Sequence, residues 1–126
     1  MMKPQIVKGK ISRDELIMIM KENFADMVKL AVDINKEILA IGGEWHSDGD
    51  ELLSKEEGYS RENVWGVNFY PRNPPEKRID CISLINIKPG FGYRQMEIQD
   101  KEIRERIRKV IEKLLLAQNE TLDIQS

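Results

Sequence analysis

The sequence predicts an α+β domain with the element order α-β-β-α-β-β-α, in which four strands form a mainly antiparallel sheet and the helices pack on one of its faces. Two observations favour this class. Apolar residues recur at helical spacing in three segments, and in shorter segments they alternate with polar residues or run almost without interruption. Short turns between the strands indicate antiparallel hairpins, since parallel strands require long crossover connections.

The first helix is expected to begin after Ser12 and to end near Ala25. Ser12 and Glu15 have the spacing of a capping box, in which a hydroxyl and a carboxylate each accept a hydrogen bond from a free backbone N–H. Beyond the box, apolar side chains at helical spacing fall on one face of the helix: Leu16, Ile19, Met20 and Phe24.

Residues 28–41 are predicted to form a β-hairpin. Apolar and polar residues alternate over 28–34, as in a half-buried strand, and an apolar pattern resumes over 37–41. Asn35 and Lys36 would form the turn, because Asn tolerates the positive φ of tight turns. One long helix over 27–40 is the alternative, since the segment contains good helix formers, but its many β-branched residues favour the hairpin.

A short second helix is expected after this hairpin. The glycine pair at 42–43 should interrupt the second strand, which then continues through 44–46. Asp48 would be the N-cap of the helix, with Glu51 completing a capping box, and Gly58 would follow its end.

The second half of the chain is expected to supply two strands and the last helix. A strand over 63–70 alternates in character, whereas a strand over 79–87 is almost continuously apolar, as in the centre of a sheet. The last helix, over 100–117, combines an apolar stripe with a charged surface. We expect one domain with an ordered core of residues 11–117 and a flexible polar tail over 118–126.

Composition and charge exclude several kinds of protein. Lys and Arg number 20 against 22 Asp and Glu, and the resulting net charge of −2 argues against a dedicated nucleic-acid partner. Cys81 is the single cysteine, so no intramolecular disulfide can form. No apolar run has the length of a membrane span, and the first residues do not resemble a secretory signal. We therefore expect a soluble, cytoplasmic protein without a membrane partner.

Three stretches of the chain carry a resemblance to a known family. An Ile-Gly-Gly-Glu-x-His motif lies within residues 38–46, a Trp-Gly-x-Asn-x-Tyr-Pro motif lies within 64–71, and the third stretch is 83–89. Together they resemble a small family of uncharacterised prokaryotic proteins, a domain of unknown function, over about 11–115. Trp45 stands where a smaller aliphatic residue is expected, a departure that concerns packing more than chemistry. The resemblance implies a shared fold and no particular activity.

Glu44 and His46 are the first candidates for a functional site. They lie two residues apart on the expected strand, so both side chains should leave the same face. Gly42 and Gly43 beside them leave room for a ligand to approach the backbone. Asn68, from another strand, could lie nearby and contribute to ligand binding.

The same region could hold a metal ion or transfer a proton. Glu44, His46, Asp48 and Asp50 form an oxygen-rich set that favours Mg²⁺ or Mn²⁺ over structural zinc. A His beside a carboxylate could also act in acid–base chemistry. The alternative is structural, because Asp48 is explained as a helix cap and Asp50 as a first-turn charge that complements the helix dipole.

Two further candidates lie later in the chain. Residues 90–94 form a glycine-containing loop that could bind an anion with Arg94 as a clamp, although the loop lacks the phosphate-loop pattern. Lys101, Arg104 and Arg108 line one side of the last helix and could contact phosphate. Neighbouring carboxylates favour a salt-bridged surface there instead.

Three functions follow from these observations. The leading hypothesis is a small cytoplasmic binding or interaction protein without catalysis, with a small molecule or an ion as ligand. The alternative is a metal-assisted or acid–base enzyme centred on Glu44 and His46. Nucleic-acid contact through the basic side of the last helix is the weakest. We also expect a homodimer, because helices on one face of a sheet leave the other face open.

Overall fold

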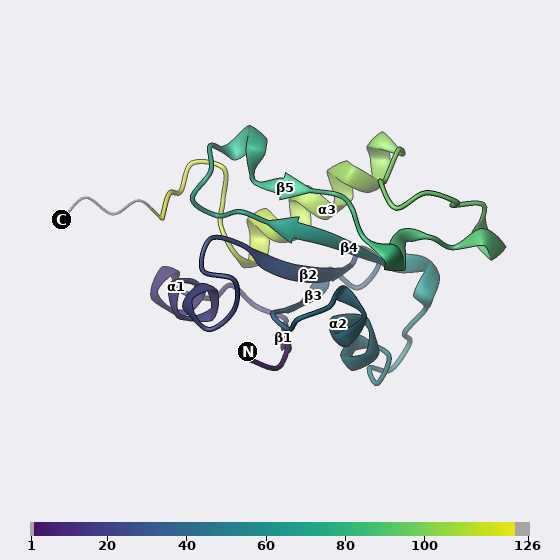
Figure 1. Cartoon of the computed structure of the whole chain (residues 1–126), viewed down its shortest axis with the longest axis horizontal. Helices are drawn as coiled ribbons and strands as arrows, with labels where there is room; N and C mark the ends of the chain where they lie inside the picture. The colour runs from purple at the N-terminus through teal and green to yellow at the C-terminus, as the bar shows by residue number, and fades with distance from the viewer. Residues whose placement is uncertain (1, 123–126) are drawn as a thin grey trace.

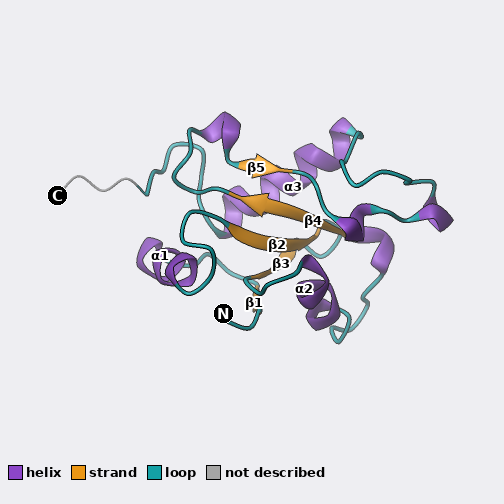
Figure 2. Cartoon of the chain, in the orientation of Figure 1, coloured by secondary structure: helices purple, strands orange, loops and turns teal. Residues whose placement is uncertain are grey.

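The computed structural model describes residues 2–122 and has an α+β fold (Figure 1). Three helices and five strands occur in this range: β1 (Gln5–Val7), α1 (Arg13–Lys21), β2 (Val28–Asp33), β3 (Ile38–Ile41), α2 (His46–Leu53), β4 (Val64–Phe69), β5 (Ile79–Asp80) and α3 (Lys101–Leu114). The strands form one sheet in the order β1-β3-β2-β4-β5, with every neighbouring pair antiparallel (Figure 2). The predicted fold class and the antiparallel character of the sheet are confirmed.

The predicted hairpin forms the centre of the sheet. Asp33, the last residue of β2, pairs with Ile38, the first residue of β3. The buried Asp33 carboxylate holds the connection, because it accepts hydrogen bonds from the N–H groups of Asn35 and Lys36 at 3.0 and 2.9 Å. The positive φ of this turn falls on Glu37, at 57°, and not on Asn35. The hairpin is therefore confirmed and the alternative helix is wrong, although the connection is longer than a two-residue turn.

α1 and α3 follow the predicted pattern. Ser12 Oγ accepts a hydrogen bond from Glu15 N at 3.1 Å, which confirms the predicted cap. α1 ends at Lys21, before Ala25, whose φ of 67° is incompatible with a continued helix. The carboxylate of Asp100 caps α3. Within residues 2–122 no helix is both long enough and apolar enough to cross a membrane.

Helices cover both faces of the sheet, which corrects the prediction of helices on one face. α1 and α3 pack on the face that carries Leu30 and Trp65. α2 packs on the opposite face, where Gly49 lies against Ala31 and Ala40. A Cβ at Gly49 would lie 3.1 Å from Ala31 Cβ and 3.2 Å from Ala40 Cβ, so the absence of a side chain allows this close approach.

Two strands differ from the prediction. β1 extends the sheet to residues that precede the expected core boundary at residue 11. β5 contains two residues, Ile79–Asp80, at an edge of the sheet, so the prediction of a central strand over 79–87 is wrong. After Asp80 the chain leaves the sheet and forms a short 3-10 helix at Leu84–Asn86. Ile85 of this stretch packs on the α2 face, whereas Cys81 belongs to the core on the opposite face.

The C-terminal segment of the described chain packs against the body of the protein. Leu122 is only 1% exposed and belongs to the core. Arg78 donates a hydrogen bond to Glu120 O at 2.6 Å, and Arg13 donates one to Thr121 O at 3.1 Å. Residues 118–122 of the predicted tail therefore make packing and hydrogen-bond contacts with the rest of the chain, and the remainder of the predicted tail lies outside the described residues.

Candidate functional site

The segment from Gly42 to His46 is a turn that leads into α2, not the continuation of a strand. Gly42 and Gly43 have φ values of 100° and 92°, which only glycine adopts readily, and they turn the chain out of the sheet. Trp45 is the N-cap of α2 and His46 is its first residue. Asp48 lies inside the helix, where its Oδ2 accepts a hydrogen bond from Trp45 N at 3.1 Å. The predictions of a strand through this segment and of Asp48 as the N-cap are wrong.

Because of this turn, Glu44 and His46 do not share a face. Glu44 lines a cavity of about 480 Å³ beside the N-terminal residues, together with Asp48. The His46 ring points toward β4, where its Nε2 lies 2.9 Å from Val67 O. The expected pairing of Glu44 with His46 depended on strand periodicity, which ends at Ile41.

Asp50 lies in a third environment. Its carboxylate accepts hydrogen bonds from Tyr59 Oη at 2.6 Å and from Arg61 Nη1 at 2.8 Å. Burial and the Asp50 carboxylate raise the pKa of Tyr59 to about 12. Over residues 2–122, no three His, Cys, Asp or Glu side chains converge to hold a metal ion. The four predicted metal ligands are therefore not brought together.

His46 lines a groove of about 390 Å³ between α2, the sheet and the segment that follows β5. We call it the His46 groove. Three polar side chains form its inner part, and three exposed apolar side chains form its rim. These six residues are Lys29, His46 and Asn68 in the inner part, and Trp45, Leu84 and Met96 in the rim.

A row of polar side chains crosses the sheet beneath the groove. Lys29 on β2 is the register partner of Asn68 on β4, which in turn pairs with Asp80 on β5. Lys29 Nζ donates to Asn68 Oδ1 at 3.4 Å, and Asn68 Nδ2 donates to Asp80 Oδ2 at 3.4 Å. Strand alternation explains the row, because it places these residues on the face opposite Leu30 and Val67.

His46 is a neutral side chain at pH 7. Burial and the positive charge of Lys29 lower its pKa from 6.5 to about 4, and hydrogen bonds to Val67 O and Asn68 offset only part of this effect. Since a carbonyl oxygen can only accept, Nε2 carries the hydrogen of the neutral ring and Nδ1 is left as an acceptor. An imidazole with such a low pKa is a weak base at neutral pH.

The rim of the groove is apolar and open to solvent. The side chains of Trp45, Leu84 and Met96 are 62%, 70% and 41% exposed. Exposed apolar side chains that gather around a groove are typical of binding surfaces, whereas isolated ones are common anywhere. Trp45, the residue that departs from the expected family pattern, enlarges this rim.

Among the residues predicted to bind a ligand, the structure brings His46 and Asn68 together and separates the others. Gly43 lines the cavity that contains Glu44, and its N–H donates to Asn23 Oδ1 at 3.1 Å. Gly42 also lies beside Asn23. Arg94 lines a different cavity, beside Trp65.

Sequence reasoning missed Lys29, Leu84 and Met96. Lys29 had a signal, because it is a polar position in the alternation of β2 and so marks the face opposite the core. Leu84 and Met96 had none, since they reach the groove only because the chain leaves the sheet after Asp80.

Two of the three basic residues predicted on one side of α3, Arg104 and Arg108, pair with carboxylates. Arg108 contacts Glu105 and lies 2.7 Å from Glu112, and Arg104 lies 3.5 Å from Glu97. These pairs reduce the positive field that a phosphate backbone would require.

Fold and groove together define a small α+β protein with an open, amphipathic groove, in which the described residues form no metal-binding cluster. The chain belongs to the family described as "Protein of unknown function (DUF5674)", whose model matches residues 5–114. This match confirms the resemblance carried by the sequence motifs and extends it to include β1. Comparisons with curated proteins and with solved structures gave no match.

Proposed function

We propose that this protein is a small cytoplasmic binding protein without catalytic activity, and that its ligand is an amphipathic carboxylate held in the His46 groove. The observation that supports the proposal is the presence of a lysine amine and three exposed apolar side chains in one groove. Such a groove can accept an apolar body at its rim and a negative group in its inner part.

Lys29 would supply the charge that selects a carboxylate. Its amine lies 5.5 Å from the centroid of the Phe24 ring, and burial lowers its pKa from the usual 10.5. No carboxylate in residues 2–122 forms an ion pair with it, since Asn68 stands between Lys29 and Asp80. A half-buried amine with one long hydrogen bond has donor capacity left for an anionic ligand.

The rim would supply most of the affinity. Burial of about 100 Å² of apolar surface against Trp45, Leu84 and Met96 would contribute about 2.5 kcal/mol. A solvent-accessible ion pair contributes only about 0–1 kcal/mol. The apolar contact therefore determines how tightly a ligand binds, and Lys29 determines which head group is preferred.

An acid–base enzyme has less support from the same geometry. Glu44 lies in another cavity, and His46 is a neutral, weakly basic ring held by Val67 O. A binding role requires neither group to exchange protons. The free, buried thiol of Cys81 is compatible with the reducing compartment that we propose.

Octanoate, octanol and octylamine test this proposal, because they share an apolar body and differ in head group. We expect octanoate to bind best and to move the indole resonance of Trp45 in ¹H–¹⁵N spectra, and octylamine to bind worst. Lys29→Met should weaken octanoate about two- to fivefold, to the level of octanol. The matched variant Lys109→Met removes a lysine elsewhere and should leave binding unchanged. Equal affinities for the three probes, or a Trp45 resonance that does not respond to any of them, would contradict the proposal.

A further inference from the structure

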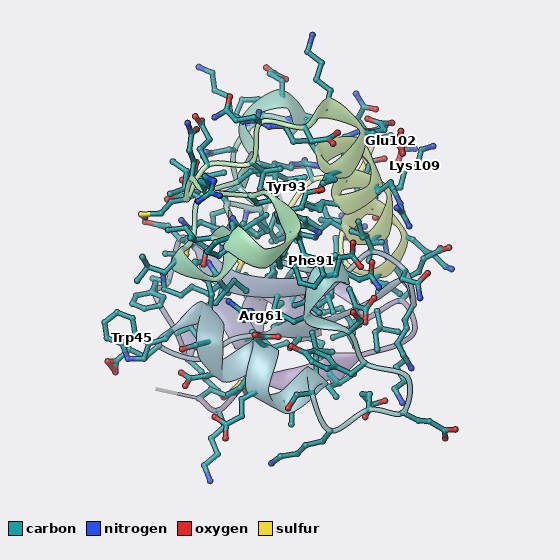
Figure 3. The ribbon with its side chains drawn as sticks, turned by 90° about the vertical axis from the view of Figure 1, so that its right-hand side faces the viewer. Trp45, Arg61, Phe91, Tyr93, Glu102 and Lys109 are labelled. Atoms are coloured by element: carbon teal, nitrogen blue, oxygen red, sulfur yellow. The ribbon has the colours of Figure 1, made fainter. Side chains whose placement is uncertain are left out.

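Residues 88–93 form a loop whose two ends lie against the body of the protein. We call it the Lys88 loop. Lys88 N donates a hydrogen bond to Tyr93 O at 2.7 Å, and Tyr93 N donates one to Lys88 O at 3.1 Å, so these two residues close the loop. The residues between them, 89–92, are exposed. Figure 3 shows Phe91 and Tyr93 above Arg61 on one face of the molecule.

Both ends of the loop meet the indole of Trp65. Lys88 Nζ lies 3.4 Å from the centroid of the indole ring, and the ring of Tyr93 meets it edge-on at 4.9 Å between centroids. Trp65 is 2% exposed. A cavity of about 440 Å³, which we call the Trp65 cavity, lies between Trp65 and residues 92–100. The Lys88 loop therefore covers Trp65 through two side chains.

The Lys88 amine is buried without a carboxylate beside it. Lys88 is 2% exposed, and its Nζ donates a hydrogen bond to Val64 O at 2.6 Å. No carboxylate in residues 2–122 forms an ion pair with this amine. An ammonium group in this position loses its water and regains one hydrogen bond and the attraction of the indole face. Closure of the loop is therefore costly while the amine is charged.

The charged groups around Lys88 offset only part of this cost. Asp50 on α2 and Glu62 on the following 3-10 helix favour the charged amine, whereas Arg61 on that 3-10 helix opposes it. Asp50 already accepts a hydrogen bond from Arg61 at 2.8 Å, so the two charges largely cancel. Tyr93 is the titratable neighbour that the loop itself supplies. Burial, followed by the charge of Arg61, lowers the pKa of Lys88 from 10.5 to about 7.

The closed loop leaves a second group without water. Trp65 Nε1–H is buried and meets no acceptor within residues 2–122. A buried donor without a partner destabilises the arrangement that buries it. Movement of the Lys88 loop away from β4 would bring water to this N–H and to the Lys88 amine together.

We propose that the Lys88 loop is a proton-controlled cover over Trp65, which stays closed when the Lys88 amine is neutral and opens more often when the amine holds a proton. This device is separate from the proposed function, since no residue of the loop lines the His46 groove.

The direction of the pH dependence follows from the two positions of the amine. In the open loop the amine is in water and keeps its proton up to about pH 10. In the closed loop its pKa is about 7. Between these values opening takes up one proton, so each unit of rising pH makes opening about tenfold rarer. Below pH 7 both forms hold the proton, and opening no longer depends on pH.

The two tryptophans make this opening measurable by hydrogen exchange. Exchange of the Trp65 indole N–H reports the opening, because the closed loop shields it from water. The indole of Trp45, which is 62% exposed, supplies the unprotected rate in the same sample, and Trp45→Phe assigns the two resonances. We expect the ratio of the Trp45 rate to the Trp65 rate to level off below pH 7. At pH 9 it should be about 30- to 100-fold higher than at pH 6.

A variant and a direct titration connect this profile to Lys88. Lys88→Met removes the titrating group and keeps an apolar side chain, so its ratio should not change with pH. Lys109→Met, which removes an exposed lysine of α3, should keep the parent's profile. The ¹³C shift of Lys88 Cε should titrate near pH 7 in the parent protein, and this measurement does not require the Lys88→Met variant to fold.

Four results would overturn the proposal. The ratio in the parent could be independent of pH, Lys88→Met could keep the parent's profile, or Lys88 could titrate near pH 10. The Trp65 N–H could also be protected as strongly as the amides at the centre of β2. Opening would then require unfolding of the whole protein, and the loop would not move independently.

Discussion

His46 contributes a neutral imidazole to the groove, because burial opposes its charged form and Val67 O holds Nε2–H. Its pKa is about 4 in the folded protein and about 6.5 in the unfolded chain. Between these values the unfolded chain binds more protons, so stability must fall as the pH decreases from 6.5 toward 4. We expect a loss of about 1–2 kcal/mol between pH 7.5 and pH 5 that is specific to this residue.

Urea unfolding at a series of pH values measures this loss. His46 is the single histidine, so His46→Gln removes the entire imidazole titration and leaves the carboxylates in place. The difference in unfolding free energy between the two proteins should change with pH through this window. Parallel pH profiles for the parent and His46→Gln would show that the ring titrates normally in the fold.

Gly66, inside the Trp-Gly-x-Asn motif, is required by close packing. A Cβ at this position would lie 2.6 Å from Ser83 Cβ and 2.9 Å from Ile85 Cγ1. We expect Gly66→Ala to destabilise the fold by about 1–3 kcal/mol, because the chain that crosses β4 must move away. Gly90→Ala is the matched control, since a Cβ there would meet nothing within 4 Å and should change stability by less than about 0.5 kcal/mol. Thermal or urea unfolding compares them, and equal stabilities would refute the packing argument.

At the scale of elements, the segment of residues 81–98 forms walls of both the His46 groove and the Trp65 cavity, and it extends beyond one end of the sheet (Figure 1). Buried Asn86 attaches this segment to β4. Its Oδ1 accepts from Gly66 N at 2.8 Å, and its Nδ2 donates to Gly66 O and to Met96 O, both at 3.0 Å.

Asn86→Ala should therefore destabilise the protein by about 2–4 kcal/mol, because it leaves both peptide groups of Gly66 buried without partners. Hydrogen exchange at the Gly66 amide should accelerate more than exchange at the centre of β2. Asn73→Ala removes an exposed side chain that donates to Lys77 O and should have a much smaller effect. If the Gly66 amide exchanged no faster in Asn86→Ala than in the parent protein, Asn86 would not be what attaches residues 81–98 to β4.

The elements that sequence reasoning identified correctly are those whose pattern arises from their own neighbours in the chain. The Ser12 cap and the alternation over 28–34 are local, and both appear in the structure. The stretch 79–87 is apolar for another reason: it covers the α2 face with Ile85 and does not pair as a strand. β1 was missed because three residues give too short a pattern to recognise.

The candidate site was predicted in part for the same reason. Asn68 and His46 lie in one groove, as expected. Strand alternation in β4 positions Asn68, whereas the first turn of α2 positions His46. The predicted pairing of Glu44 with His46 does not form, because the chain changes direction at Gly43, which has a positive φ. The spacing of residues predicts a shared face only as long as the strand continues, so a turn that is not recognised makes the prediction fail.

At the scale of the whole molecule, a homodimer would have to form through a different surface from the one predicted. The open sheet face on which that prediction depended does not exist, because α2 covers it. The exposed rim of the His46 groove is the apolar surface that could join two copies, and three side chains provide a small contact. We therefore expect weak self-association, detectable only at high micromolar concentration.

Sedimentation measures this association and its location. Leu84→Ser should abolish it, whereas Met18→Ser, which changes an exposed side chain on α1, should not. Octanoate should also shift the equilibrium toward monomer, because it occupies the same rim. Association that persists in Leu84→Ser would place the interface elsewhere.

The position of the β2–β3 hairpin has a consequence for how the chain assembles. The hairpin closes the shortest loop among the described strand pairs, yet it lies in the middle of the sheet, between β1 and β4. The pairs that β1 and β4 form with the hairpin join residues that are distant in sequence, such as Val7 with Leu39 and Asp33 with Val64. Because closing a long loop costs more entropy than closing a short one, the sheet should grow outward from this hairpin. During synthesis, the innermost strands can therefore pair before β4 has been translated.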